Sequence, residues 1–350
     1  MNQPTVYRAA IAPVPTDAPR PLWSVMIPTY HCADYLRQTL ASVLAQDLGA
    51  DVMQIQVVDD HSTLDDPEAA VRELGQGRIE FYRQPQNVGY IRNFETCLER
   101  SRGHLVHLLH GDDLVRVGFY QKLQRAFKQH PELGAAYCRH IICDEYGHWQ
   151  RLSPVEQSQS GILSDALARI VSRHPIQTPS IAVRRSVYEQ LGGFDRRMAS
   201  CGEDWEMWVR IAAHYPVWFE AEPLAIYRSR ASSLSGKAMR TGQNLRDVRL
   251  ATQLIQPYLP AAQAKLLHQQ ASHLWAFWGL SCARDMLAQG DYSGGLVQIR
   301  EALCCATSAS VIQFLPLVLL AIVSHWNRQL RQAWNQLHCG KTELSRSEEL

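Results

Sequence analysis

Apolar residues from Leu22 to about residue 115 alternate between short continuous runs and segments with helical spacing. A short apolar run predicts a buried strand, and apolar residues three and four positions apart predict one face of a helix. Strands are expected at 23–28, 52–58, 79–82 and 105–109, and helices at 34–46, 66–74 and 91–100. Strands separated by helices predict βαβ units, and therefore an α/β fold with a mostly parallel sheet and helices on both of its faces.

The strand pattern weakens after residue 115. A helix is expected from near Arg116, and further strands are expected at 133–138, 180–184, 217–219 and 224–227. From about residue 240 only helical patterns follow. They include one or two helices at 261–289 and a stretch at 302–327 without Asp, Glu, Lys or Arg.

These patterns divide the chain into four parts. Residues 1–21 carry five prolines and little apolar periodicity, which predicts a flexible leader outside the fold. Residues 22–235 form the expected α/β domain, and residues 236–340 form an all-helical C-terminal region. The polar residues 341–350 are expected to be a flexible tail.

Composition narrows the class of protein. The 350 residues are 46% hydrophobic and 20% charged, which is typical of a soluble globular chain. Lys and Arg number 35 against 34 Asp and Glu, a net charge of +1, so nucleic acid is not an expected partner. The nine cysteines form no CxxC pair and no signal peptide is visible, which predicts a cytosolic protein in a reducing compartment.

Ligands of parallel sheets bind outside the carboxyl ends of the strands, so the residues after each strand are candidates for chemistry. Asp112 and Asp113 follow the predicted strand at 105–109. Two adjacent carboxylates there can hold Mg²⁺ or Mn²⁺ together with a substrate diphosphate. The alternative is that one of them caps the next helix and the other is solvated.

Two other loops carry weaker signals. Asp60 lies just after the predicted strand at 52–58. It either accepts hydrogen bonds from the base or ribose of a ligand, or it caps a helix. His61, next to it, is interpreted as a polar loop residue. Arg92 lies in the first turn of a predicted helix and either reaches a phosphate or lies on the surface. Neither a dinucleotide-binding GxGxxG pattern nor a P-loop occurs in the sequence.

Three acids, Glu203, Asp204 and Glu206, open another predicted helix. The helix dipole favours acids at this position. However, Trp205 and Trp208 imply that this helix start is partly buried, and a partly buried carboxylate is a candidate general base. Position alone does not choose among the three acids.

Seven motifs between Trp23 and about Ser235 occur in an order that resembles the family-2 glycosyltransferases. They are SVMIPTY at 24–30, VVDDHS at 57–62, NVGYIRN at 87–93, GHLVHLLHGDD at 103–113, TPS to GGFD at 178–195, GED at 202–204 and IYR at 226–228. Each motif is weak alone, and their order carries the resemblance. It implies the GT-A fold and an inverting enzyme that uses a nucleotide-diphosphate sugar as donor.

The resemblance also implies a role for each matching residue. These are Pro28, Tyr30 and Asp60 for the nucleoside base, Asp112 and Asp113 for the metal-binding aspartate motif, Asp204 for the catalytic base and Glu203 for positioning the acceptor. Asp113 is the expected direct ligand of the divalent cation. The implied acceptor is a saccharide or a lipid-linked molecule, in the assembly of a cell-surface polysaccharide or glycolipid.

The chain departs from the family pattern at three positions. His31 stands where the family usually has Asn, and His110 stands where the aspartate motif often begins with an acid. Arg230 stands where the family often has a histidine that can bind the metal. An arginine cannot bind a cation, but it can grip the diphosphate directly. A divalent cation is therefore expected but not required.

The C-terminal region raises the question of a membrane. The uncharged stretch at 302–327 has the length of a spanning helix, although polar residues dilute it. Arg328 and Arg331 follow it, and Trp326 and Trp334 bracket these arginines, as at an interface. Residues 302–334 therefore pack against the protein or a second subunit, lie on a membrane surface, or span the membrane. The first two interpretations allow a homo-oligomer and a place on the inner face of the membrane.

Two other functions compete with glycosyl transfer. A nucleotidyltransferase needs a Gly-rich basic loop after the first strand, and the loop PTYHCAD has no glycine. A degenerate sugar-nucleotide-binding or scaffolding protein is suggested by His110 and Arg230. The presence of both Asp113 and Asp204 argues against it, because a protein without catalysis has no need of a base.

Overall fold

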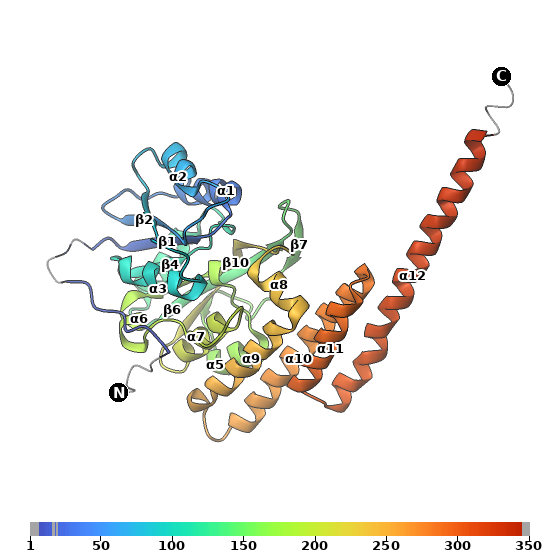
Figure 1. Ribbon diagram of the computed structural model, residues 1–350. Helices are drawn as coiled ribbons and strands as arrows, with labels where there is room; N and C mark the ends of the chain where they lie inside the picture. Colours follow the sequence, from blue (N-terminus) through green and yellow to red (C-terminus); the bar gives the residue numbers. More distant parts are fainter. Residues whose placement is uncertain (1–6, 16–17, 19, 345–350) are drawn as a thin grey trace.

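A computed structural model describes residues 7–15, 18 and 20–344. The strands are β1 Trp23–Thr29, β2 Met53–Asp59, β3 Glu80–Arg83, β4 Leu105–Leu108, β5 Leu114–Val115, β6 Ala135–Cys143, β7 Trp149–Leu152, β8 Gly161–Ile162, β9 Ile181–Arg184 and β10 Val217–Arg228. The helices are α1 Ala33–Leu44, α2 Pro67–Gly75, α3 Tyr90–Arg100, α4 Phe119–Gln129, α5 Ala166–Arg173, α6 Arg185–Leu191, α7 Glu203–Ala212, α8 Leu234–Thr241, α9 Gln243–Leu254, α10 Ala264–Gln289, α11 Tyr292–Cys305 and α12 Ala309–Leu344. Figure 1 shows an α/β body followed by helices alone.

The strands join in one mixed sheet in the order β3-β2-β1-β4-β9-β6-β10-β5, with β7 beside β6 and β8 beside β10. The first four strands pair in parallel, as do β6 and β10. Strand β9 is antiparallel to both of its neighbours and joins the two parallel halves. The predicted α/β class with a mostly parallel sheet is confirmed.

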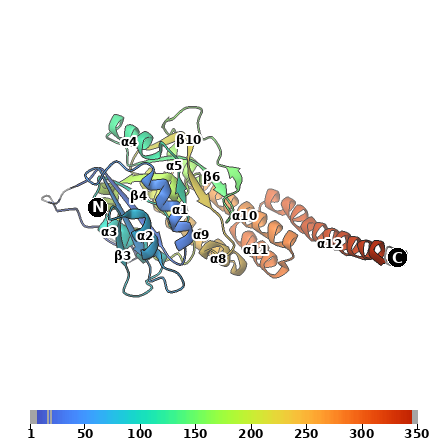
Figure 2. The same ribbon diagram turned by 90° about the horizontal axis from the view of Figure 1, so that it is seen from above.

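The sheet has a hydrophobic core on each face because buried side chains of a strand point alternately to the two sides. In β1, Val25 and Ile27 belong to one core and Met26 to the other. Helix α1 covers the first core with Leu36 and its neighbours, and α3 covers the second with Phe94 and its neighbours. Helices therefore lie on both faces, as the spacing predicted (Figure 2).

Several predicted boundaries differ from the structure. The strands predicted at 217–219 and 224–227 are one strand, β10, which continues through irregular pairing around Pro223. The helix expected near Arg116 begins at Phe119, after the short strand β5. The helical stretch predicted at 302–327 is broken, because Ala306 is extended between α11 and α12.

Residues 7–15 pack on the α/β domain, so the prediction of a flexible leader outside the fold is wrong for them. Arg8 forms ion pairs with Asp195 and Glu206, whose side chains are fully buried. The Gly193 and Arg196 amides donate to the Ala9 and Tyr7 carbonyls. The prolines predicted a flexible segment, but an isolated β-bridge between Arg8 and Asp195 and the buried ion pairs fix it. Residues 1–6, 16–17 and 19 of the predicted leader lie outside the described residues.

The C-terminal helices begin against the domain and end away from it. Helix α10 is a single helix over the stretch predicted at 261–289, and it contacts α5, α9, α11 and α12. Val311, Val318 and Ala321 of α12 are buried and His325 contacts the Ala288 carbonyl, whereas the C-terminal end of this helix extends away from the body (Figures 1 and 2). Helix α12 continues to Leu344, so the predicted tail at 341–350 begins inside it, and residues 345–350 lie outside the described part.

Candidate active site

The loops that leave β1 and β4 meet at the carboxyl edge of the sheet. The Gly111 amide donates to the Pro28 carbonyl over 2.9 Å, and the Asp60 amide donates to the Thr29 carbonyl over 2.9 Å. A Cβ on Gly111 would lie 2.9 Å from Thr29 Oγ1, so only glycine allows this approach. The tight packing places the aspartate motif directly beside the β1 loop.

The aspartate motif forms a compact group of possible metal ligands. Ligand atoms of His110, Asp112 and Asp113 all lie within 4.8 Å of one another. Asp113 Oδ1 accepts the Arg228 amide over 2.8 Å, whereas Asp113 Oδ2 and His110 Nε2 are buried without a hydrogen-bond partner. Buried polar atoms are normally paired. The unpaired Asp113 oxygen fits the oxygen ligands that Mg²⁺ and Mn²⁺ prefer, and His110 Nδ1 lies 3.6 Å from it.

Arg230 occupies the other side of this group. Its Nε donates to Asp112 Oδ2 over 3.1 Å, and its guanidinium lies 4.8 Å from the centre of the Tyr35 ring. Arg228 packs on the same ring at 4.7 Å and donates to the Asp112 carbonyl over 3.0 Å. Positive charge therefore already lies beside Asp112, where the family often has a neutral metal ligand.

The predicted base, Asp204, lies in the first turn of α7. Its Oδ2 is 3.5 Å from Thr178 Oγ1 and 3.8 Å from His174 Nε2, and its Oδ1 accepts the Trp205 amide over 2.7 Å. Burial raises the pKa of Asp204, but the contact with His174 and the Trp205 amide outweigh it, so the pKa is lowered. Asp204 is therefore ionised at neutral pH, the form that a general base needs.

Glu203, beside it, is in the opposite state. The Tyr90 hydroxyl group donates a hydrogen bond to Glu203 Oε2 over 3.2 Å. Burial, together with the charge of Asp204, raises the pKa of Glu203 to about 8. Two neighbouring acids whose environments push their pKa values apart can take different chemical roles. The third acid of this helix start, Glu206, forms ion pairs with Arg210 and Arg8 in the core and is therefore not a candidate base.

Glu203→Gln should remove a pH dependence of stability. The folded protein holds a proton on Glu203 that the unfolded chain releases at its lower pKa, so stability falls as pH rises from about 4.5 to about 8. Thermal melts of the ligand-free protein across this range should show a shallower decline for the Gln variant. Equal slopes in the two proteins would contradict the raised pKa of Glu203.

His110 connects the aspartate motif with the predicted base. Burial is the largest influence on His110 and lowers its pKa, while the charges of Asp112 and Asp204 both raise it. The His110 ring stacks on Phe94 at 5.1 Å, and Phe94 contacts Tyr90, which holds Glu203. The two sets of acids, about ninety residues apart in the chain, thus face one histidine.

The predicted nucleotide-binding residues lie in different places. Tyr30 is 47% exposed beside His31, as a stacking platform requires. Asp60 is buried, and its two carboxylate oxygens accept the Val88 and Gly89 amides over 2.7 and 3.1 Å, so it also shapes the loop before α3. Arg92 is exposed and lines a small hollow of about 260 Å³ with Glu95 and Arg196, apart from the aspartate motif.

Three residues around these acids were not singled out from the sequence. His174 and Thr178 contact Asp204, and Tyr90 contacts Glu203. Tyr90 and Thr178 lie inside motifs that resemble the family, but nothing in their local pattern indicates these contacts. His174 is an isolated loop histidine, and its role depends entirely on the packing of α5 against α7.

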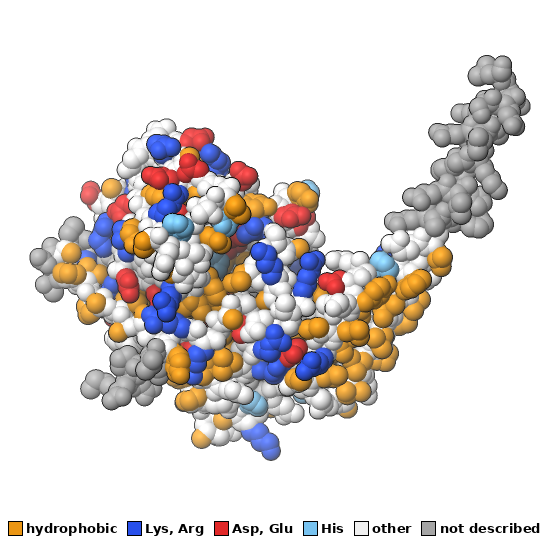
Figure 3. All heavy atoms as spheres, in the orientation of Figure 1, with side chains coloured by type: hydrophobic (Ala, Val, Ile, Leu, Met, Phe, Trp, Pro, Cys, Tyr) orange, Lys and Arg blue, Asp and Glu red, His pale blue; other side chains and the backbone are white. Residues whose placement is uncertain are grey.

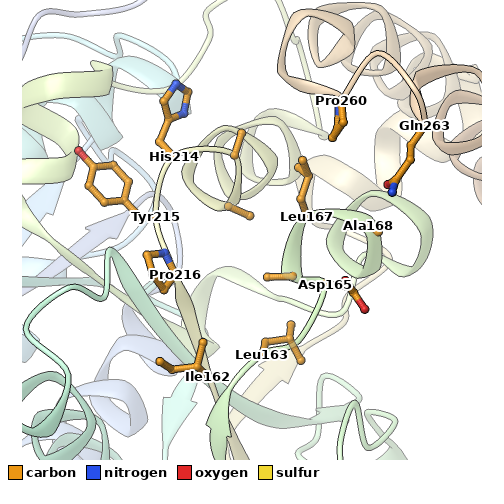
Figure 4. Close-up of a pocket in the computed structure, with 13 residues that line it drawn as sticks. Ile162, Leu163, Asp165, Leu167, Ala168, His214, Tyr215, Pro216, Pro260 and Gln263 are labelled. Atoms are coloured by element: carbon orange, nitrogen blue, oxygen red, sulfur yellow. The ribbon is translucent and has the colours of Figure 1, made fainter.

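Another hollow lies away from these acids. A cavity of about 570 Å³ opens between α5, the loop before β10 and the start of α10 (Figure 4). Its lining is mainly apolar, with Leu167, Pro216 and Pro260 among the residues labelled there. It includes none of the acids discussed above, so volume alone does not identify the site of chemistry.

A family model supplies the decisive comparison. The model described as glycosyl transferase family 2 matches residues 24–192, which include β1 and the aspartate motif. These residues belong to glycosyl transferase family 2. The resemblance stated from the motifs is therefore confirmed.

Two sequence relatives illustrate how far the likeness extends. An uncharacterized protein of Mycobacterium tuberculosis is 29% identical over 248 residues, which cover 67% of this chain and 76% of that protein. The O-antigen biosynthesis protein RfbC of Myxococcus xanthus is 26% identical over 212 residues, 55% of this chain but only 16% of that protein. The chain thus corresponds to a small part of the second relative.

Two solved structures share the fold. Residues 1–349 of TarS from S. aureus, in complex with UDP-GlcNAc, align with a TM-score of 0.60 at 15% identity, over 90% of this chain and 91% of that one. The mannosyltransferase PcManGT from Pyrobaculum calidifontis, in complex with GDP-Man and Mn²⁺, aligns with a TM-score of 0.53 at 20% identity, over 91% and 89%. The α/β domain therefore has the GT-A fold, and an all-helical region follows it, as predicted.

Proposed function

We propose that this chain transfers a sugar from a nucleotide-diphosphate sugar to a hydroxyl group of a saccharide or lipid-linked acceptor, with inversion at the anomeric carbon. The observation that carries the proposal is the convergence of Asp112, Asp113 and Asp204 on His110. A donor diphosphate at the aspartate motif and a general base at Asp204 would both lie near His110, with the reacting sugar between them. Relatives and fold neighbours named for O-antigen biosynthesis and for complexes with UDP-GlcNAc and GDP-Man support this class of substrate.

On the donor side, Asp113 Oδ2 and His110 would hold the cation, with Asp112 beside them. The unpaired buried atoms of this group fit a divalent ion. Such a cation stabilises the negative charge that develops on a leaving diphosphate. Arg230 is placed to bind the same diphosphate once it exchanges its contact with Asp112 for the ligand.

On the acceptor side, Asp204 removes the proton from the attacking hydroxyl group. Asp204 is ionised and the neighbouring Glu203 holds its proton near neutral pH, so Glu203 can donate a hydrogen bond to the acceptor and position it. Inversion follows from direct attack on the anomeric carbon from the face opposite the diphosphate. Pro28, Tyr30 and Asp60 would hold the nucleoside base.

A thermal-shift panel tests the donor site. UDP, GDP, dTDP and CMP are each added with and without Mn²⁺, and the nucleotide of the natural donor should raise the melting temperature. A ligand at about 100 times its dissociation constant stabilises the folded state by about 2.7 kcal/mol. A shift that needs Mn²⁺ supports the cation site, and a shift without it assigns the diphosphate to Arg230. The absence of any shift would overturn the proposal in favour of a degenerate scaffold.

We further propose that the enzyme works at the inner face of a membrane, with α12 on the lipid surface. Residues Ala309–Arg331 form a helix long and apolar enough to cross a membrane, and 18% of its most apolar window is buried. An apolar band follows α11 and α12 in Figure 3, with Leu296, Leu317 and Val323 exposed. Trp326 and Arg328 follow this band, as in helices that lie in an anionic interface.

Vesicle flotation tests this location. The full chain should float with vesicles that contain phosphatidylglycerol. The double substitution Leu317→Glu/Val323→Glu should lower the bound fraction about tenfold, because each substitution removes an apolar side chain that would be buried in the lipid. Leu64→Glu and Val117→Glu, on residues that are 83% and 80% exposed in the α/β domain, are matched controls. No binding by the wild type, together with a concentration-dependent dimer in sedimentation, would assign this band to a second copy of the chain.

A further inference from the structure

A single histidine lies behind the predicted base. His174 follows α5 with a φ of 46°, and its Nε2 lies 3.8 Å from Asp204 Oδ2. The same nitrogen is buried and has no hydrogen-bond partner. A small rotation of the ring would bring the two atoms into hydrogen-bond distance.

The C-terminal helical region fixes the position of this ring. Trp275 of α10 packs on His174 with ring centroids 5.3 Å apart, and it packs edge-on against Trp205 at 5.1 Å. Trp205 Nε1 in turn donates to the Ile170 carbonyl of α5 over 2.9 Å. The helices α5, α7 and α10 therefore hold His174 beside the Asp204 carboxylate.

We propose that His174 accepts at Nε2 the proton that Asp204 removes from the acceptor hydroxyl, and then releases a proton to solvent. This inference rests on the proposed function, in which Asp204 is the base. It assigns His174 as a positioning residue that acts through Asp204, since it does not touch the reacting sugar.

The transfer balances without a further reactant. The acceptor oxygen forms a bond to the anomeric carbon while the bond from that carbon to the diphosphate breaks, and the diphosphate leaves with the electron pair. The acceptor proton moves to Asp204 Oδ2 and from there to His174 Nε2. Before this step the ring is neutral with its hydrogen on Nδ1. The transfer produces an imidazolium whose Nε2–H faces Asp204, the arrangement in which His174 lowers the pKa of Asp204. The imidazolium then loses one proton to water, to which its side chain is 19% exposed.

The surroundings explain why a second group is useful. Asp204 has a lowered pKa, so it holds a proton only briefly at neutral pH. Histidine is the side chain that exchanges protons most readily near neutral pH. Other titratable groups whose charges act on or are affected by Asp204 include His110, Glu203, Cys201 and Tyr227, and His140 interacts with His174. His174 differs from them in that its buried, unpaired Nε2 lies 3.8 Å from Asp204 Oδ2.

Chemical rescue with imidazole tests the inference. Asparagine tolerates a positive φ but cannot take up a proton, so His174→Asn preserves the backbone and removes the acceptor. Glycine also tolerates this φ and leaves space for an added imidazole molecule. The reaction is hydrolysis of UDP-GlcNAc or GDP-Man by the full chain with Mn²⁺, followed as release of UDP or GDP, because water can replace the acceptor.

Both variants should lower kcat about 10- to 100-fold with the donor KM unchanged. Added imidazole should restore His174→Gly at least about tenfold and should leave Asp204→Asn inactive. Arg173→Gln, which removes an exposed neighbour paired with Glu156, is the control and should match the wild type.

The outcomes separate this inference from the proposed function. Wild-type kcat in His174→Asn, or failure of imidazole to restore His174→Gly, would overturn the role of His174 while Asp204→Asn remains inactive. Wild-type activity in Asp204→Asn would overturn the base itself. Hydrolysis of neither donor by the wild-type protein, without a nucleotide shift in the thermal panel, would overturn both.

Discussion

Asp204→Asn should fold like the wild type and lose about 10²- to 10⁴-fold in kcat, with little change in donor binding. The amide oxygen can still accept the Trp205 amide that Asp204 Oδ1 accepts over 2.7 Å. What disappears is the ionised carboxylate proposed to take the acceptor proton. The measurement is the steady-state release of nucleoside diphosphate from the donor that the thermal panel selects, with circular dichroism to confirm folding.

The control should remove an acid that has no part in the proposed chemistry. Asp165→Asn is suitable, because Asp165 is exposed before α5 with a φ of 51°, which Asn tolerates. We expect wild-type turnover from this control. Equal turnover from Asp204→Asn would transfer the role of base to Glu203 and contradict the assignment made from the family motif.

Asp113→Asn should abolish the response to Mn²⁺ and lower kcat about 10²- to 10³-fold, because a bound cation contributes several kcal/mol to stabilising the leaving diphosphate. The fold should tolerate the change. The amide oxygen of the new side chain would still accept the Arg228 amide, as Asp113 Oδ1 does over 2.8 Å. Thermal melts of the ligand-free and nucleotide-bound protein, each with and without Mn²⁺, measure the loss directly.

Asp66→Asn is the matched control for this second substitution. Asp66 caps α2 by accepting the Ala69 amide, and asparagine caps a helix equally well. A Mn²⁺-dependent shift that survives in Asp113→Asn would assign the cation to Asp112. Full activity of Asp113→Asn without Mn²⁺ would mean that Arg230 supplies the positive charge on its own.

The order of elements in the α/β domain was predictable from local patterns. The strand Trp23–Thr29 is buried throughout and carries the apolar run Val25–Ile27, and helices such as α3 bury Ile91, Phe94 and Leu98 on one face. The segment around Arg8 was not predictable in the same way. Its order comes from ion pairs with Asp195 and Glu206, about 190 residues away, which no local pattern reports.

The candidate site shows the same difference between local sequence patterns and tertiary contacts. Asp112, Asp113 and Asp204 were found because each follows a recognisable motif, and the structure brings all three to His110. Their neighbours were not found. Arg230 was predicted to grip a diphosphate, and in the structure it pairs with Asp112, a contact that depends on how β10 ends beside the motif.

The sequence by itself determined the α/β class, the family and the acids that are candidates for chemistry. Each of these is encoded in neighbouring residues, through the spacing of apolar positions and short motifs at strand ends. Only the tertiary structure decided the different states of Glu203 and Asp204 and the contact with His174. Those properties depend on burial, on hydrogen bonds from Tyr90 and on the packing of Trp275, and all of these arise from segments that meet only in the folded chain.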